Sequence, residues 1–86
     1  MAVFLISYEL RKSDFDYQPL LDALHEIGAK RIQEYIWGVR IEWSSEHVFD
    51  HLWAHMNRVN DRLLVVHFES SDGYKSHNAI NKLSTL

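Results

Sequence analysis

The feature that most constrains the fold is a repeated change in the spacing of apolar residues along the chain. Residues 3–9 are rich in β-branched and aromatic side chains, which is typical of a strand. Asp14 or Asp16 is placed to cap a helix over residues 16–27, and Gly28 is placed to end it. The apolar stripe of that helix consists of Tyr17, Leu20, Leu21, Leu24 and Ile27.

The same two spacings recur further along the chain. Apolar residues occur at every second position along much of residues 29–43, which is typical of strands. Gly38 offers a kink or turn that would split this run into two strands. One face of this run would carry Tyr35, Trp37, Val39, Ile41 and Trp43. Ser44 or Ser45 is placed to cap a second helix that runs to about residue 58. Its inner face would carry Val48, Phe49, Leu52, Trp53 and Met56.

The order of these elements favours an α+β sandwich. Residues 62–69 contain a continuous apolar run of strand length, which closes the series. A ferredoxin-like βαββαβ domain over residues 1–69 is the natural candidate, with two helices on one face of an antiparallel sheet. Residues 70–86 form a polar C-terminal tail that we expect to pack on the domain or on a dimer partner.

Composition limits the classes of function. The chain has no cysteine, which excludes disulfides and thiolate metal sites. The formal net charge of −3 argues against a general phosphate-binding surface, so nucleic acid would have to meet a local patch. The N-terminal apolar run is too short for a signal peptide or a membrane span. We therefore expect a soluble, cytoplasmic protein without a membrane partner.

Both faces of the predicted sheet carry apolar rows. The first strand places one row on each side, since alternate residues point to opposite faces. Two helices cover only one side, and soluble proteins rarely leave such a large aliphatic surface in water. A homodimer through the second face is the preferred expectation, and the alternative is that the C-terminal tail folds back over it. The two rows are Phe4, Ile6 and Tyr8, and Val3, Leu5, Ser7 and Glu9.

Glu9 ends the row that would lie at this interface. A two-fold axis would bring two copies of Glu9 together. Because neighbouring carboxylates repel, they would need a proton or a cation between them, and Mg²⁺ or Mn²⁺ suits oxygen ligands. The alternative is that Glu9 is a solvated strand end.

Four short segments occur in the order FLISYEL, RKSDFD, RIQEYIW and NDRLLVV, within residues 3–69. In this order they resemble segments of the small CRISPR-associated adaptation proteins of the Cas-two type and the related SinR-like proteins. The resemblance implies a ferredoxin-like homodimer in which an acidic residue at the strand end of each protomer binds a divalent metal. Glu9 matches that position, where the family has aspartate. Some members of the family cleave RNA or DNA, and others hold DNA without catalysis.

For this chain the resemblance implies a metal-dependent endonuclease of antiviral defence, or an inactive dimeric scaffold for nucleic acid or protein. Glu9 from both chains would hold Mg²⁺ or Mn²⁺, which would activate a water molecule. Neighbouring phosphates would be held by Arg11, Lys12 or Arg31. The water or the ion would be oriented by Ser7, Tyr8 and Asp14. The alternatives are that Tyr8 is a core residue, that Ser7 ends the apolar row and that Asp14 caps a helix.

Histidines recur in two places. His67 shares a row of the last strand with Leu63 and Val65, and we expect it near Glu9 at the interface. There it would act as a pH-sensitive partner or general base, or as an ordinary interface residue. On the second helix, histidines recur every four residues, at His47, His51 and His55, which is a spacing known from metal ligands. No glutamate or cysteine completes a metal site there, which favours a solvated face.

Overall fold

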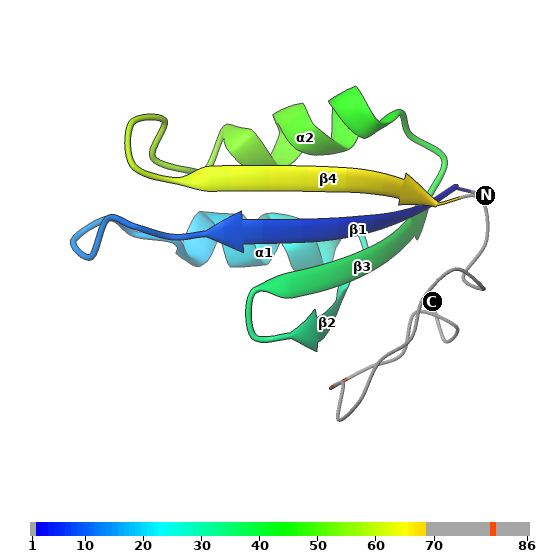
Figure 1. The fold of residues 1–86 in the computed structure, drawn as a ribbon, viewed down its shortest axis with the longest axis horizontal. Helices are drawn as coiled ribbons and strands as arrows, with labels where there is room; N and C mark the ends of the chain where they lie inside the picture. Colours follow the sequence, from blue (N-terminus) through cyan, green and yellow to red (C-terminus); the bar gives the residue numbers. More distant parts are fainter. Residues whose placement is uncertain (1, 69–79, 81–86) are drawn as a thin grey trace.

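The structure is a computed structural model that describes residues 2–68 and Ile80. The described chain contains β1 (Ala2–Glu9), α1 (Gln18–Glu26), β2 (Lys30–Gln33), β3 (Ile36–Ile41), α2 (Ser45–Trp53) and β4 (Arg62–Phe68). The strands form an antiparallel sheet in the order β2-β3-β1-β4, with both helices on one face (Figure 1). The predicted ferredoxin-like α+β sandwich is confirmed. None of the described helices is long and apolar enough to cross a membrane.

The residues at the two ends of helix α1 explain where it starts and stops. The Asp16 carboxylate accepts a 3.0 Å hydrogen bond from the backbone N–H of Gln18, and Pro19 occupies the first turn, where a helix needs no N–H donor. Gly28 has φ +79°, the left-handed conformation that glycine adopts without strain after a helix. The helix is therefore slightly shorter than the predicted residues 16–27.

Helix α2 begins as predicted but ends early. The Ser44 hydroxyl accepts a 3.0 Å hydrogen bond from the backbone N–H of His47, which caps the first turn. Beyond Trp53 the backbone forms a tighter turn, in which the N–H of Met56 donates to the Trp53 carbonyl three residues earlier. The Asn57 side chain then accepts N–H bonds from Val59 and Asn60, which turns the chain away from the helix.

The β2–β3 hairpin turns at Glu34 and Tyr35, so the predicted break at Gly38 is wrong. Gly38 lies inside β3, where it is buried and pairs with Leu5 of β1 on one side and with Lys30 of β2 on the other. The strand continues through Gly38, and Trp37 and Val39 on either side of it are buried in the core.

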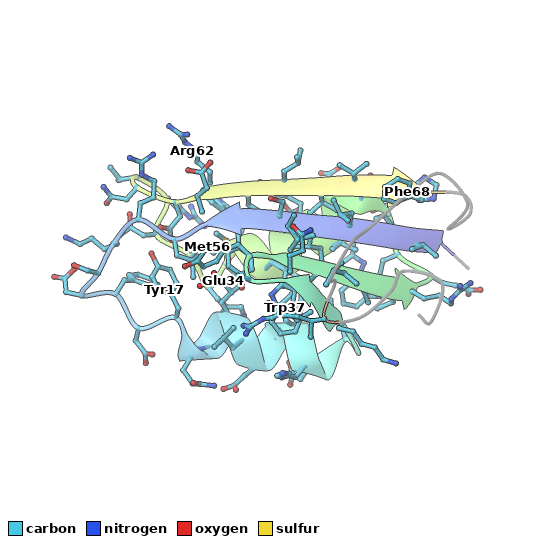
Figure 2. The ribbon with its side chains drawn as sticks, turned by 60° about the horizontal axis from the view of Figure 1, so that its bottom comes forward. Tyr17, Glu34, Trp37, Met56, Arg62 and Phe68 are labelled. Atoms are coloured by element: carbon cyan, nitrogen blue, oxygen red, sulfur yellow. The ribbon has the colours of Figure 1, made fainter. Side chains whose placement is uncertain are left out.

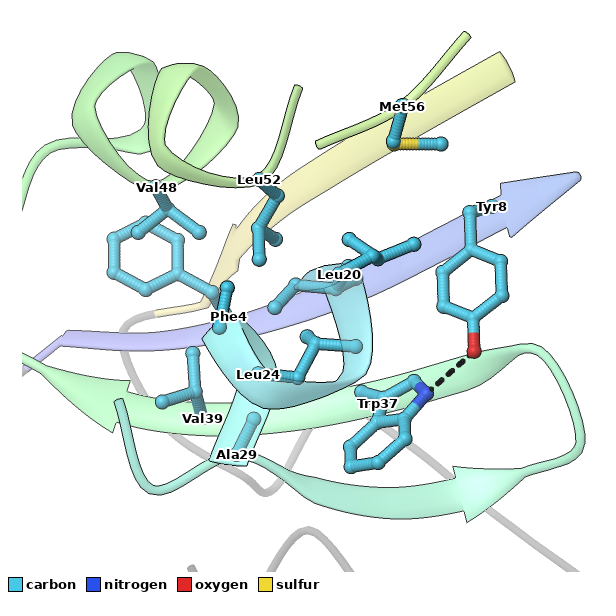
Figure 3. Packing of buried hydrophobic residues seen from close by; sticks show 12 residues of the cluster. Phe4, Tyr8, Leu20, Leu24, Ala29, Trp37, Val39, Val48, Leu52 and Met56 are labelled. Atoms are coloured by element: carbon cyan, nitrogen blue, oxygen red, sulfur yellow. Dashed lines mark hydrogen bonds between the residues drawn. The ribbon is translucent and has the colours of Figure 1, made fainter. Parts of the chain in front are cut away.

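The main core lies between the sheet and the two helices, as Figure 3 shows. The sheet contributes buried aromatic and aliphatic side chains from its two central strands, and the helices contribute mainly leucine and valine. In this core the indole Nε1 of Trp37 donates a 2.9 Å hydrogen bond to the hydroxyl of Tyr8. The central members are Phe4, Ile6, Tyr8, Trp37, Val39, Leu20, Leu24, Val48 and Leu52.

The second face of the sheet is only partly covered. Val3 and Ile32 are buried there, with Leu5 packed beside them, whereas Leu64 is 58% exposed. The backbone N–H of Ile80 donates a 2.8 Å hydrogen bond to the carbonyl of Ile32, so this one described residue of the tail lies at the edge strand β2. The rest of the predicted tail, residues 70–79 and 81–86, lies outside the described residues, as does residue 69.

Candidate functional site

Glu9 lies at the end of β1, on the second face of the sheet, as the alternation of the strand predicted. It pairs in register with Arg62, the first residue of β4. Its carboxylate lies 3.5 Å from the Arg62 guanidinium and 3.7 Å from that of Arg11. We call Glu9, Arg11 and Arg62 the Glu9–arginine cluster. All three side chains are more than half exposed, so these ion pairs orient the groups more than they stabilise the fold.

Two shallow hollows open on either side of Glu9. The first has a volume of about 230 Å³ and lies toward β4. The second has a volume of about 220 Å³ and lies toward the β2–β3 turn. A ligand at this end of the sheet would therefore reach Glu9 from two sides. The first hollow is lined by Ser7, Tyr8, Glu9, Arg62, Leu63 and Leu64, and the second by Tyr8, Glu9, Leu10, Arg11 and Tyr35.

Asp61 organises the backbone around the cluster, although sequence reasoning missed it. It is only 7% exposed, and its carboxylate accepts the backbone N–H of Arg11 at 2.8 Å and that of Asn57 at 2.7 Å. It also accepts the Tyr17 hydroxyl at 2.6 Å. Burial raises the pKa of Tyr17, and the hydrogen bond to Asp61 raises that pKa further. Asp61 thus holds the backbone of Arg11 in place, and it directly precedes Arg62 in the sequence.

The residues predicted to support Glu9 divide into two groups. Ser7 is half-buried and lines the hollow toward β4, and Arg11 pairs with Glu9. The Lys12 ammonium lies 3.3 Å from the Asp14 carboxylate, so these two exposed residues pair with each other. Tyr8 is a core residue, as the alternative expectation held, and its hydroxyl accepts from Trp37. The N-cap residue of α1 is Tyr17, so neither predicted aspartate occupies that position, although the Asp16 carboxylate accepts the N–H of Gln18.

Arg31 lies apart from the cluster. It is on the edge strand β2, where it pairs in register with Trp37 and its guanidinium carbon lies 4.8 Å from the centroid of that ring. Trp37 belongs to the core on the helix side of the sheet, whereas Glu9 is on the other side. Strand β3 separates β2 from β1. Within one chain Arg31 therefore does not lie beside Glu9.

His67 is also remote from Glu9. It pairs in register with Phe4, and the two rings lie 5.3 Å apart. Glu9 pairs with Arg62, five residues away along β4, which corresponds to about 17 Å in a strand. Figure 2 shows Arg62 and Phe68, the neighbour of His67, at opposite ends of the strand. His67 is therefore no partner of Glu9 within one chain, because the antiparallel register separates them.

The histidines of α2 form an aromatic cluster with Trp43. The ring of His47 stacks on Trp43 at 3.9 Å, and the rings of His51 and Trp43 meet edge-on at 5.2 Å. The rings of His51 and His55 lie 6.3 Å apart. His47 is exposed, whereas His51 and His55 are half-buried, so the expected solvated face is only partly solvated.

A metal ion would need more ligands than one copy of the described chain supplies. Within residues 2–68 and Ile80, no three acidic or histidine side chains form a group that could hold an ion. Glu9 offers one carboxylate beside two cations, which does not fit a resident Mg²⁺ or Mn²⁺ ion by itself. No model of a known protein family matches the chain.

Proposed function

We propose that this protein is a homodimeric, non-catalytic scaffold that binds the phosphate backbone of nucleic acid through the Glu9–arginine cluster. The observation that carries the proposal is the pairing of the Glu9 carboxylate with two guanidinium groups, at 3.5 and 3.7 Å. A carboxylate placed in this way brings two guanidinium groups to the same end of the sheet.

The charges of the cluster favour an anion. One carboxylate and two guanidinium groups leave a net charge of +1 at the end of the sheet. Each guanidinium has five N–H donors, of which Glu9 can occupy only some, so donors remain for phosphate oxygens. Arg11 is held through its backbone by Asp61, and Arg62 by the register of β1 and β4, so both donors start from fixed positions.

Dimerisation through the second face of the sheet accounts for its apolar surface. Leu64 is 58% exposed on this face, next to the half-buried Leu5 and Val66. Two copies packed through this face would bury these side chains and bring both Glu9–arginine clusters to one interface. Two clusters would supply four arginines to one ligand, which offsets the overall charge of −3 per chain.

A metal-dependent endonuclease is the second candidate, because the Glu9 carboxylate is 57% exposed and lines both hollows. In the dimer two copies of Glu9 would together offer two carboxylates to Mg²⁺ or Mn²⁺. A bound ion would supply an activated water molecule and shield the charge of the attacked phosphate. In this candidate Arg11 and Arg62 would orient the substrate.

The substitution Glu9→Gln separates the two candidates, because they predict opposite results. For a scaffold, removal of a negative charge beside the arginines should tighten binding of labelled RNA and DNA about two- to fivefold. For an endonuclease, the same change should abolish cleavage in Mg²⁺ or Mn²⁺. The matched control is Glu42→Gln, which removes the same charge near the opposite end of β1, and it should leave both readouts unchanged.

The cleavage assay includes EDTA, and RNA and duplex DNA are both tested. Cleavage that requires metal and disappears in Glu9→Gln would overturn the scaffold and support the endonuclease. Absence of binding to every nucleic acid by the native dimer would overturn both candidates.

A further inference from the structure

Tyr35 presents an aromatic ring beside the Glu9–arginine cluster. It lies in the β2–β3 turn and is 51% exposed, which sets it apart from the other tyrosine, phenylalanine and tryptophan residues within residues 2–68. Its carbonyl accepts a 3.2 Å hydrogen bond from the backbone N–H of Tyr8, which ties the turn to β1. The turn therefore holds Tyr35 at a fixed place next to the strand end.

The support beneath Tyr35 is rigid. Its ring meets the ring of Tyr8 edge-on, with centroids 5.9 Å apart and planes at 69°. Tyr8 is buried and is held in turn by the 2.9 Å hydrogen bond from Trp37, which is also buried. An exposed ring that already packs against a buried neighbour loses less conformational entropy than a free ring when a ligand stacks on it.

Tyr35 forms part of the wall of the hollow that contains Arg11 and Glu9. The volume of about 220 Å³ is below the range of about 300–1,000 Å³ for pockets that enclose a whole drug-sized ligand. A single planar ring system suits this space better than a complete cofactor. The wall offers a ring for stacking, a guanidinium for a phosphate and a carboxylate that can accept from an amino group.

We propose that this hollow binds one unpaired nucleobase, stacked on Tyr35, while Arg11 pairs with an adjacent phosphate. The inference rests on the proposed nucleic-acid scaffold and specifies its ligand as single-stranded nucleic acid. In a duplex both faces of each internal base are already stacked, so such a base cannot use Tyr35 without leaving the helix. Stacking on an aromatic side chain contributes to binding with every base, so the preference is for strand type rather than sequence.

The test compares two fluorescein-labelled probes by fluorescence anisotropy, an unpaired oligonucleotide and a blunt duplex of equal length. Tyr35→Ala should weaken binding of the unpaired probe about tenfold and leave binding of the duplex unchanged. Tyr35→Leu, which keeps apolar bulk but removes the ring, should lose as much. Tyr35→Phe is the matched control and should bind both probes as the native protein does.

Other outcomes separate the two proposals. Equal losses on both probes, or native binding by Tyr35→Ala, would overturn the base site and leave the scaffold in place. Absence of binding to either probe by the native protein would overturn the scaffold itself. Circular dichroism and light scattering of each variant check its fold and mass, and a dimer that dissociates in Tyr35→Leu would overturn the inference by making Tyr35 a contact between copies.

Discussion

The Tyr17 hydroxyl donates a 2.6 Å hydrogen bond to the Asp61 carboxylate, which joins the segment before α1 to the segment before β4. These residues are 44 positions apart in the sequence. The same carboxylate accepts the backbone N–H groups of Arg11 and Asn57. One buried side chain therefore positions both connections that flank the Glu9–arginine cluster.

Replacement of Asp61 by asparagine should destabilise the protein. The amide would place N–H donors where the native carboxylate accepts from three donors, and hydrogen bonds to a charged group contribute about 1.5–3 kcal/mol each. We expect Asp61→Asn to lower the free energy of unfolding by about 2–3 kcal/mol in urea. Asp22→Asn is the control, because Asp22 is exposed and accepts only from the Gln18 side chain among the described contacts. A similar loss in both variants would contradict the role of Asp61.

Tyr17 should make the stability of the protein fall at alkaline pH. Its pKa is raised above 10.0, first by burial and then by the hydrogen bond to Asp61. A raised folded-state pKa means that the folded protein keeps the phenolic proton after the unfolded chain has lost it. The contribution of Tyr17 is therefore complete below about pH 10 and is lost as the pH rises through the folded-state pKa.

The comparison with Tyr17→Phe isolates this effect from other alkaline titrations. At about pH 8 the variant should be less stable than the native protein, because it lacks the bond to Asp61. The difference should shrink as the pH rises above about 10 and through the raised folded-state pKa of Tyr17, because the native tyrosine then also loses that bond. Urea unfolding at each pH measures the difference, and a constant value over this range would show that Tyr17 does not titrate as described.

The bond between Tyr8 and Trp37 gives a third prediction. Tyr8→Phe leaves the indole N–H of Trp37 buried without its acceptor, which costs about 1–3 kcal/mol. Thermal unfolding should therefore show a clearly lower Tm. Tyr35→Phe removes the same hydroxyl from an exposed ring and should leave the Tm within experimental error. If both variants melt alike, the Tyr8–Trp37 bond contributes nothing measurable.

The spacing of apolar residues was sufficient to predict the fold. The side-chain periods of strands and helices depend only on local backbone geometry. The buried and exposed faces of β1, α1 and α2 could therefore be assigned from the sequence, and Glu9 could be assigned to the second face of the sheet. The C-terminal end of α2 could not be assigned, because Asn57 and Asp61 redirect the chain through side-chain contacts to the backbone. In the sequence, the short polar run around these two residues indicates only that a turn is present.

The composition of the site could not be predicted in the same way. Arg62 pairs with Glu9 through strand register, which a single sequence does not specify. The same register places His67 opposite Phe4, far from the strand end where it was expected. Arg31 was grouped with Arg11 by charge alone, whereas Arg31 lies on the edge strand β2 and Arg11 follows β1, which β3 separates from β2.

A charge on the second face of the sheet should dissociate the proposed homodimer. Leu64 is 58% exposed on this face, and Leu64→Glu would place two like charges close to the symmetry axis. Light scattering should give twice the chain mass for the native protein and the mass of one chain for the variant. Val59→Glu introduces the same charge at a 90% exposed residue outside the strands and should remain dimeric. A native monomer would contradict the dimer.

The salt dependence of nucleic-acid binding tests how the arginines act. Each phosphate contact to a single strand contributes about −0.7 to the slope of log K against log salt concentration. Arg11→Ala and Arg62→Ala should each lower the magnitude of the slope by about 0.7 if a strand crosses one cluster, and by about 1.4 if it crosses both clusters of the dimer. Lys30→Ala, on the far edge strand, should keep the native slope. If Lys30→Ala changes the slope as much as Arg62→Ala does, binding depends on overall charge rather than on the Glu9–arginine cluster.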